Sequence, residues 1–190
     1  MTEQDRIVLK LVAGFLDYPG SPQFRERFAS RYPSAAHSCP DLARALEALN
    51  GLGWQRLAEI YVEAFDWSER GTLYLTAHEL GDARERGEAL AALNQTLSQA
   101  GYEAADGELP DYIPLLLEFL AVSPVSATSD LAPRTAQALG QVAQALGLNH
   151  PYYPLLDLAR RALGEANQPV GEGRREAPDL ENLPYPTAYP

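Results

Sequence analysis

The sequence predicts an all-α fold, and three observations support this. Apolar residues recur every three or four positions through most of residues 1–163, which is the period of an amphipathic helix. Glycine, asparagine and proline interrupt that period where helices of ordinary length would end. No stretch alternates apolar and polar residues long enough to indicate a β-ladder.

Four helices are predicted in the first third of the chain. They cover residues 7–16, 22–32, 42–49 and 54–65. Residues 33–40 contain two prolines and predict a loop. Asp41 is the expected N-cap of the third helix, because its carboxylate can accept hydrogen bonds from first-turn amides.

Five more helices are predicted after residue 67. They cover residues 73–80, 82–100, 111–122, 131–146 and 152–163. Ser68 and Asp111 are the expected caps of the first and third of these. Gly81 is the expected C-terminal stop of helix 73–80. Asp82 then opens the next helix, with Glu85 as its capping-box partner.

The length and composition predict one domain and a tail. The 190 residues fit a single domain, which we assign to residues 1–163. Residues 164–190 are rich in proline and acidic side chains and predict a disordered segment. Tyr185 and Tyr189 are each followed by proline, so they indicate either a docking motif or an ordinary solvated tail.

The charge balance excludes some partners. Fifteen basic residues against 26 acidic residues give a formal net charge of −11. Nucleic-acid binding requires clustered lysine and arginine, so no nucleic-acid partner is expected. The same charge repels anionic membrane surfaces and attracts basic protein segments.

Cysteine content and the apolar runs indicate the compartment. Cys39 is the single cysteine, which fits a reducing environment. The first twenty residues lack the pattern of a secretory signal, and no apolar run is long enough to span a membrane. We therefore predict a cytoplasmic protein without direct membrane insertion.

Motifs for catalysis and for cofactor binding are absent from the sequence. It contains no P-loop, no dinucleotide-binding glycine motif and no nucleophile elbow. A single cysteine cannot build a cysteine-rich zinc site, and no Glu-x-x-His pair indicates a di-iron centre. We predict that the protein is not an enzyme and carries no metal or other cofactor.

Four side chains on two neighbouring predicted helices allow two interpretations. Tyr61 and Phe65 form one pair four residues apart, and Tyr74 and His78 form another. Such aromatic pairs usually pack in a core. They can also form the wall of a groove for an amphipathic peptide.

The turn at residues 81–87 raises a similar question. Gly87 lies inside a predicted helix, where glycine is costly, so another backbone is expected to approach it, from this domain or from a partner. Arg84 and Arg86 either pair with neighbouring acids, form a fixed buried ion pair, or hold carboxylates of a partner.

The helix predicted at residues 111–122 is apolar around most of its girth. Asp111 and Glu118 share the remaining narrow face, two turns apart. This acidic strip is either solvated or partly enclosed and directed toward a basic ligand.

Four motifs in this region resemble a known family. Residues 61–66 (YVEAFD), 73–78 (LYLTAH), 81–87 (GDARERG) and 108–114 (ELPDYIP) are similar to conserved segments of the nitrate reductase molybdenum cofactor assembly chaperones. This is the NarJ, or delta-subunit, family. The four motifs occur in the family's order over about sixty residues, which makes the resemblance specific.

The resemblance implies a fold and a function. It implies a helical bundle of the molybdoenzyme maturation chaperone type that acts in the cytoplasm. Family members bind the apo catalytic (alpha) subunit of respiratory nitrate reductase, including its N-terminal segment, before the complex docks at the membrane. They permit molybdenum cofactor insertion and then leave. We expect a monomer, and the alternative is a stable structural subunit of a molybdoenzyme complex.

The resemblance also places the expected partner-binding surface around the Asp82 turn and the helix at residues 111–122. The residues we assign to it are Tyr61, Phe65, Asp66, Tyr74, His78, Asp82, Arg84, Arg86, Asp111, Tyr112 and Glu118.

Overall fold

The computed structural model describes residues 1–104, 107–123 and 130–164. These residues form helices and no strand, which confirms the predicted fold class for this part of the chain. The helices are α1 (Glu3–Phe15), α2 (Pro22–Ser38), α3 (Pro40–Asn50), α4 (Trp54–Tyr61), η1 (Val62–Asp66), α5 (Leu75–Leu80), α6 (Arg86–Gln99), α7 (Ile113–Val122), α9 (Leu131–Leu146) and α10 (Tyr153–Ala162). Apart from Gly164, the tail lies outside the described residues.

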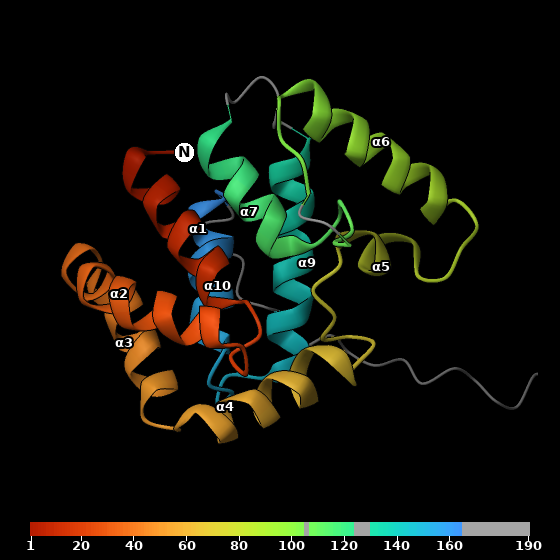
Figure 1. Ribbon diagram of the computed structural model, residues 1–190. Helices are drawn as coiled ribbons and strands as arrows, with labels where there is room; N and C mark the ends of the chain where they lie inside the picture. Colours follow the sequence, from red (N-terminus) through yellow and green to blue (C-terminus); the bar gives the residue numbers. More distant parts are fainter. Residues whose placement is uncertain (105–106, 124–129, 165–190) are drawn as a thin grey trace, which may run out of the picture.

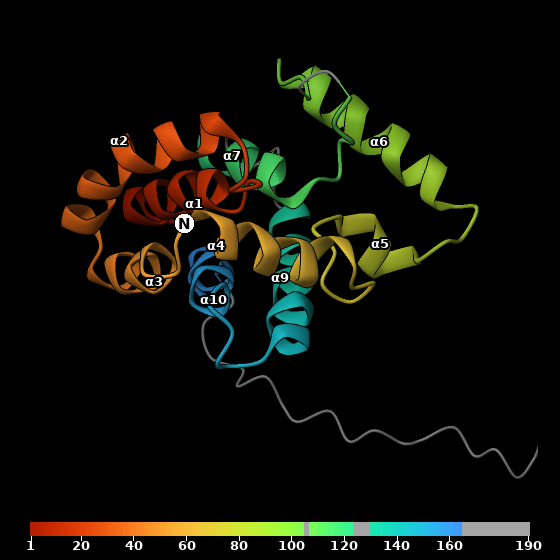
Figure 2. The ribbon, with the colours of Figure 1, turned by 60° about the horizontal axis from the view of Figure 1, so that its bottom comes forward.

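The helices pack around α1, α7, α9 and α10. Helix α1 contacts α7 and α10, and α10 contacts α9 (Figure 1). Helices α2 and α3 pack together on one side of this group, while α5 and α6 lie on the other side, beyond α9 (Figure 2). None of the helices within the described residues combines the length and apolarity of a membrane span.

Apolar burial holds α1 and α7 at the centre. Leu9 and Val12 of α1 are fully buried, as are Leu116 and Phe119 of α7. A buried side chain of this size contributes about 1.5–3 kcal/mol relative to an exposed one. Arg6 adds a polar link, because its Nη1 donates to the Ala121 carbonyl at 2.9 Å at the end of α7. The prediction that the 111–122 helix is buried around most of its girth is confirmed.

The predicted loop at residues 33–40 is wrong. Helix α2 continues through Pro33 to Ser38. Pro33 is exposed. An interior proline loses one backbone hydrogen bond and crowds the carbonyl four residues earlier, which disfavours a helix but does not forbid one. Phe28 and Tyr32, one turn apart, stack with ring centroids 5.4 Å apart and support the helix just before that point.

Two predicted helix starts are also wrong. Helix α3 begins at Pro40, with Cys39 at its N-cap, and Asp41 instead pairs with Arg44 inside the first turn. Ser68 caps no helix. Its hydroxyl accepts a hydrogen bond from the Gly71 amide at 3.1 Å and closes a turn.

The start of α6 lies later than predicted. The helix begins at Arg86 with no side-chain cap, so neither Asp82 nor Glu85 forms the expected capping box. Gly87 is exposed, and a Cβ added there would meet no atom within 4 Å. The expectation that a backbone of this domain approaches Gly87 is therefore wrong. The predicted stop at Gly81 is confirmed, since its φ is 57° and its amide bonds the Ala77 carbonyl.

Candidate functional site

A cleft lies between η1, the loop at residues 67–72, α5 and the last turns of α9. Its volume is about 1080 Å³. We call it the client cleft. Its floor and rim contain Phe65, Asp66, Trp67, Glu69, His78 and Asp82, and α9 contributes Gln141 and Gln144.

A π-helical turn shapes one wall of this cleft. The sequence predicts one continuous helix over residues 54–65, but α4 ends at Tyr61 and the chain widens into η1. The Trp67 amide donates to the Val62 carbonyl at 3.1 Å, five residues back. Wide turns of this kind insert an extra residue and often occur at functional sites. Here the turn exposes Asp66 and Trp67 while Phe65 stays buried.

Gly71 permits the wide turn to pack against the loop that follows it. A Cβ built at Gly71 would lie 1.8 Å from the Ala64 carbonyl oxygen. No real Cβ approaches an oxygen so closely, so any other residue would force the two segments apart. The absence of a side chain at this position therefore fixes the distance between η1 and the loop.

The cleft has an apolar floor and an acidic rim. The Phe65 ring is buried at the floor, while Trp67 is 79% exposed at the rim. The carboxylates of Asp66, Glu69 and Asp82 are on exposed residues around the opening, and Arg70 is the single arginine or lysine among the lining residues. The rim is therefore net negative at neutral pH.

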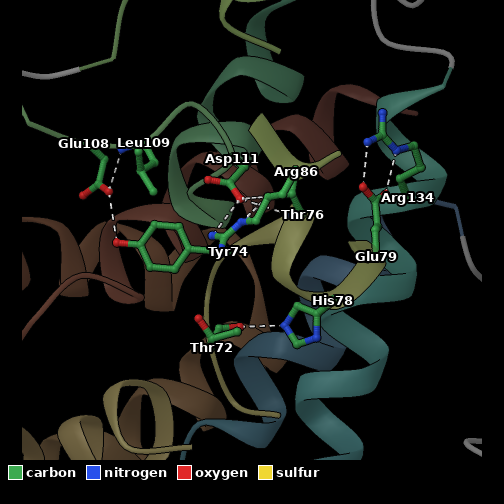
Figure 3. Close-up of polar contacts among 10 residues, drawn as sticks. All are labelled: Thr72, Tyr74, Thr76, His78, Glu79, Arg86, Glu108, Leu109, Asp111 and Arg134. Atoms are coloured by element: carbon green, nitrogen blue, oxygen red, sulfur yellow. Dashed lines mark hydrogen bonds and ion pairs between the residues drawn. The ribbon is translucent and has the colours of Figure 1, made fainter. Parts of the chain in front are cut away.

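Helix α5 supplies His78 and is fixed to its neighbours. His78 Nε2 lies 2.7 Å from the Thr72 carbonyl oxygen (Figure 3). A carbonyl only accepts, so Nε2 carries the hydrogen of this bond. Glu79 on the next position accepts two hydrogen bonds of 2.7 Å from Arg134 of α9. This bidentate pair sets the position of α5, and hence of His78, against α9.

A second set of polar contacts, the Asp111 cluster, consists of Thr76, Arg86 and Asp111 (Figure 3). Asp111 Oδ2 accepts from the Thr76 amide at 3.1 Å and from the Thr76 hydroxyl. The same hydroxyl accepts from Arg86 Nε at 3.0 Å. Arg86 Nη2 lies 3.7 Å from Asp111 Oδ2, so the three side chains connect α5, α6 and the segment before α7.

Backbone bonds reinforce the Asp111 cluster. The Leu75 amide donates to the Asp111 carbonyl at 2.9 Å, and the Ile113 amide donates to the Leu73 carbonyl at 2.8 Å. These bonds flank an isolated antiparallel bridge between Tyr74 and Tyr112. The start of α5 and the start of α7 are therefore held together by main chain as well as side chains.

The predicted acidic strip on the 111–122 helix is wrong. Asp111 precedes α7 and is fully buried, and Tyr112 occupies the N-cap without a side-chain hydrogen bond. Glu118 is half-buried on α7, outside the client cleft. An aspartate before a helix usually caps it, but here its carboxylate turns to Thr76 and Arg86, which the local sequence does not reveal. Of the alternatives for Arg86, the ion pair is the one observed.

Three tyrosines of the expected surface, Tyr61, Tyr74 and Tyr112, are not among the residues that line the client cleft. The Tyr61 hydroxyl donates to the Leu16 carbonyl at 3.0 Å and lies 3.3 Å from the Tyr112 hydroxyl. Burial, with Tyr112 as a smaller cause, raises the pKa of Tyr61 far above its ordinary value. Tyr74 donates to Glu108 at 3.2 Å, and burial followed by that carboxylate raises the pKa of Tyr74 to about 12. These phenols stay neutral and serve packing.

The structure divides the expected surface into separate groups. Phe65, Asp66, His78 and Asp82 line the client cleft. Arg84 is exposed on the turn between α5 and α6. The other expected residues lie in the Asp111 cluster, in the tyrosine contacts or on α7. Tyr61 packs in the core, whereas Phe65 belongs both to the core and to the floor of the client cleft.

Sequence reasoning missed several lining residues. Trp67 directly follows the YVEAFD segment, and a tryptophan after a helix end is a signal that could have indicated it. Glu69 and Arg70 lie in the same loop. Gln141 and Gln144 have no local signal, because only the packing of α9 brings them to the cleft. Among the described residues, no group of three His, Cys, Asp or Glu could hold a metal ion.

Comparison with known proteins identifies relatives along most of the chain. The profile of the family described as "Nitrate reductase delta subunit" matches residues 30–151. A probable nitrate reductase molybdenum cofactor assembly chaperone, NarJ of Bacillus subtilis, is 30% identical over 134 residues, covering 70% of this chain and 65% of that protein.

Two further relatives agree with this match. The nitrate reductase molybdenum cofactor assembly chaperone NarJ of Escherichia coli K12 is 32% identical over 140 residues, covering 67% of this chain and 58% of the relative. The nitrate reductase-like protein NarX of Mycobacterium tuberculosis H37Rv is 33% identical over 117 residues, which is 60% of this chain and 18% of that protein. The chain thus spans less than two thirds of the length of these relatives. The profile match and the shared motifs lead to one conclusion: the chain belongs to the nitrate reductase delta subunit family.

Proposed function

We propose that the protein is a cytoplasmic assembly chaperone that binds a basic, amphipathic segment of a nitrate reductase subunit in the client cleft. The observation that carries the proposal is the combination of an apolar floor with an acidic rim. Phe65 closes the floor, Trp67 offers an exposed apolar ring at the rim, and Asp66, Glu69 and Asp82 add negative charge around them. A peptide with apolar side chains on one face and cations beside them complements both parts.

The dimensions of the cleft suit a peptide segment. Its volume of about 1080 Å³ lies slightly above the roughly 300–1,000 Å³ typical of small-molecule sites. The lining residues come from three separate parts of the chain, and most of them are polar or charged. Such an open, polar rim suits one face of a protein segment better than a small molecule, which usually binds in an enclosed pocket.

The charges of the whole chain support the same partner. The formal net charge is −11, and a field of this sign steers basic segments toward the surface before contact. Within the cleft, Arg70 is available to orient the segment by repelling its cations or pairing with an acid. The acids at the rim contribute more to the rate of association than to final affinity, because they are exposed.

We assign the client as the apo catalytic (alpha) subunit of respiratory nitrate reductase, bound through its N-terminal segment. The names of the Bacillus and Escherichia relatives support a role in cofactor assembly. On this proposal the protein acts before the complex docks at the membrane, as a monomer, and performs no catalysis. It holds the client while molybdenum cofactor is inserted and carries no cofactor itself.

Native co-purification from cells stalled in molybdenum cofactor synthesis tests this assignment. Mass spectrometry of complexes captured with the protein is expected to identify the unfinished catalytic subunit, and completion of cofactor synthesis is expected to release it. The alternative, a stable structural subunit, requires the chain to be present in stoichiometric amount in the purified active membrane enzyme. Finding it there would overturn the chaperone assignment.

A further inference from the structure

A second cleft lies next to the client cleft and is walled by aromatic side chains. It has a volume of about 600 Å³, and its apolar lining includes Tyr18, Trp54, Ala58, Val62 and Trp67. We call it the tryptophan groove. Trp67 lines both clefts, so an occupant of the groove also changes access to the client cleft.

The groove is built on a rigid base with exposed aromatic rims. Trp54 meets Phe24 and Phe28 edge to face, with ring centroids 6.2 and 5.3 Å apart, so its position is fixed by the core. Tyr18 is 46% exposed and Trp67 is 79% exposed. Exposed aromatic side chains that cluster around one groove commonly mark an interaction site.

We propose that the groove binds residues 184–190 of the same chain, whose sequence is PYPTAYP. Proline-rich segments prefer the extended polyproline II conformation and bind grooves lined by aromatic side chains at little entropic cost. This segment places three prolines and two tyrosines within seven residues. The groove and the segment proposed to bind in it thus belong to the same chain.

Charge favours this segment over the rest of the tail. Residues 165–183 contain five acids and two arginines, whereas residues 184–190 contain no charged side chain. Glu59, Glu63 and Arg25 line the groove, and Arg56 pairs with both glutamates. The groove therefore carries little net charge and suits an uncharged occupant. The phenols of Tyr185 and Tyr189 can donate hydrogen bonds to such carboxylates.

The connecting chain is long enough for docking within one molecule. Nineteen residues lie between Gly164, the last described residue, and Pro184. Fully extended, a chain of this length spans at most roughly 65 Å. A domain of this size has a radius of gyration of about 15 Å, so the segment can reach any part of the surface. Docking of the segment shields Trp67 and competes with a client that contacts the same ring.

Tryptophan fluorescence tests the proposal directly, because the chain has two tryptophans and both line the groove. The full chain is compared with the full-length variant Tyr185→Ala/Tyr189→Ala by acrylamide quenching under selective tryptophan excitation. Loss of docking is expected to increase quenching and shift the emission to longer wavelength. The variant Pro169→Ala/Pro178→Ala alters the tail outside the segment and is expected to behave as the original chain.

Addition in trans identifies the occupant. The capped peptide PYPTAYP, which contains no tryptophan, is titrated into the Tyr185→Ala/Tyr189→Ala protein and is expected to reverse the change. Trp67→Ala in that protein is expected to weaken peptide binding at least about tenfold, whereas Leu148→Ala, at a 76% exposed leucine outside both clefts, leaves it unchanged.

Three outcomes would overturn the proposal. One is equal quenching of the original chain and the double tyrosine variant, and another is a peptide that changes neither tryptophan. The third is a quenching difference that depends on protein concentration, which would assign the segment to a second copy of the chain. The test needs no client, so it stands apart from the proposed chaperone role.

Discussion

Asp111 accepts two hydrogen bonds from Thr76 with one carboxylate oxygen, one from the amide at 3.1 Å and one from the hydroxyl. Asp111 is fully buried. Removing either Asp111 or the Thr76 hydroxyl therefore leaves the other side chain without this hydrogen bond and without water to replace it. The arrangement fixes the first turn of α5 to the segment before α7. Since α5 carries His78 and borders the client cleft, the shape of the cleft depends on this buried pair.

Replacing Asp111 is expected to destabilise the fold in a graded way. Asp111→Ala leaves the Thr76 amide without its acceptor and removes the carboxylate that faces Arg86, and is expected to lower the free energy of unfolding by about 3–5 kcal/mol. Asp111→Asn keeps an acceptor for Thr76 and loses only the charge, with an expected cost of about 1–3 kcal/mol. Urea denaturation measures both.

Glu118→Gln is the matched control, because Glu118 is half-buried on α7 outside the Asp111 cluster. It is expected to change stability by less than about 1 kcal/mol. If Asp111→Ala cost no more than Glu118→Gln, the Asp111 cluster would not hold α5 in place.

Replacing two glycines by alanine is expected to change the stability of the protein in opposite directions. Gly71→Ala places a Cβ against the Ala64 carbonyl at 1.8 Å and is expected to destabilise the protein by about 3 kcal/mol or more, because the backbone must move. Gly87→Ala meets open space in the first turn of α6 and is expected to stabilise it by about 0.5–1 kcal/mol. Thermal unfolding of both variants gives the sign of each change.

A destabilised Gly87→Ala protein would show that α6 has a neighbour at this position. A Gly71→Ala protein as stable as the original would show that η1 and the loop do not pack as described.

Buried tyrosines predict sensitivity to alkaline pH. Burial raises the pKa of Tyr61, Tyr74, Tyr112 and Tyr152 above the ordinary value of 10.0. A raised pKa means that the folded state favours the protonated phenol. This contribution to the free energy of unfolding is complete below pH 10.0 and is lost as the pH rises above it.

Urea denaturation of Tyr61→Phe at neutral and alkaline pH measures the effect. The variant is expected to lose about 1 kcal/mol at neutral pH, from the missing hydrogen bond to Leu16. It is also expected to show a smaller decline above pH 10.0 than the original chain. Tyr18→Phe, at an exposed ring, is the control. An unchanged alkaline decline in Tyr61→Phe would contradict the assigned burial.

The sequence predicted the helices well and their contacts less well. Helical periodicity identified the segments 131–146 and 152–163 closely, because a single amphipathic face determines such helices. The stop at Gly81 was also predictable, since the local chain requires a positive φ there. These features depend on neighbouring residues alone.

The misplaced features depend on residues far apart in the sequence. Aspartate directly before a helix usually caps it, but the partners of Asp111, Thr76 and Arg86, lie at least 25 residues away in the sequence. The wide turn of η1 leaves the apolar period nearly unchanged, so periodicity could not distinguish it from α-helix. The glutamines of α9 reach the cleft only through tertiary packing.

The acidic rim is expected to control the affinity for a basic client. The variant Asp66→Asn/Asp82→Asn removes two exposed charges without changing side-chain size. Each charge removed is expected to weaken binding about two- to fivefold at low salt, with a smaller effect at high salt. Glu47→Gln, an exposed acid on α3 away from the client cleft, is expected to leave binding unchanged. Equal losses in both variants would assign the effect to net charge and not to the rim.

Isothermal titration calorimetry with a peptide from the N-terminus of the cognate nitrate reductase catalytic subunit measures whether the client cleft binds this segment. Saturable binding is expected with one peptide per chain, weakened in Asp66→Asn/Asp82→Asn and retained in Glu47→Gln. No detectable binding to the folded protein at high micromolar peptide, or binding that the rim substitutions leave unchanged, would contradict the assignment of the client cleft.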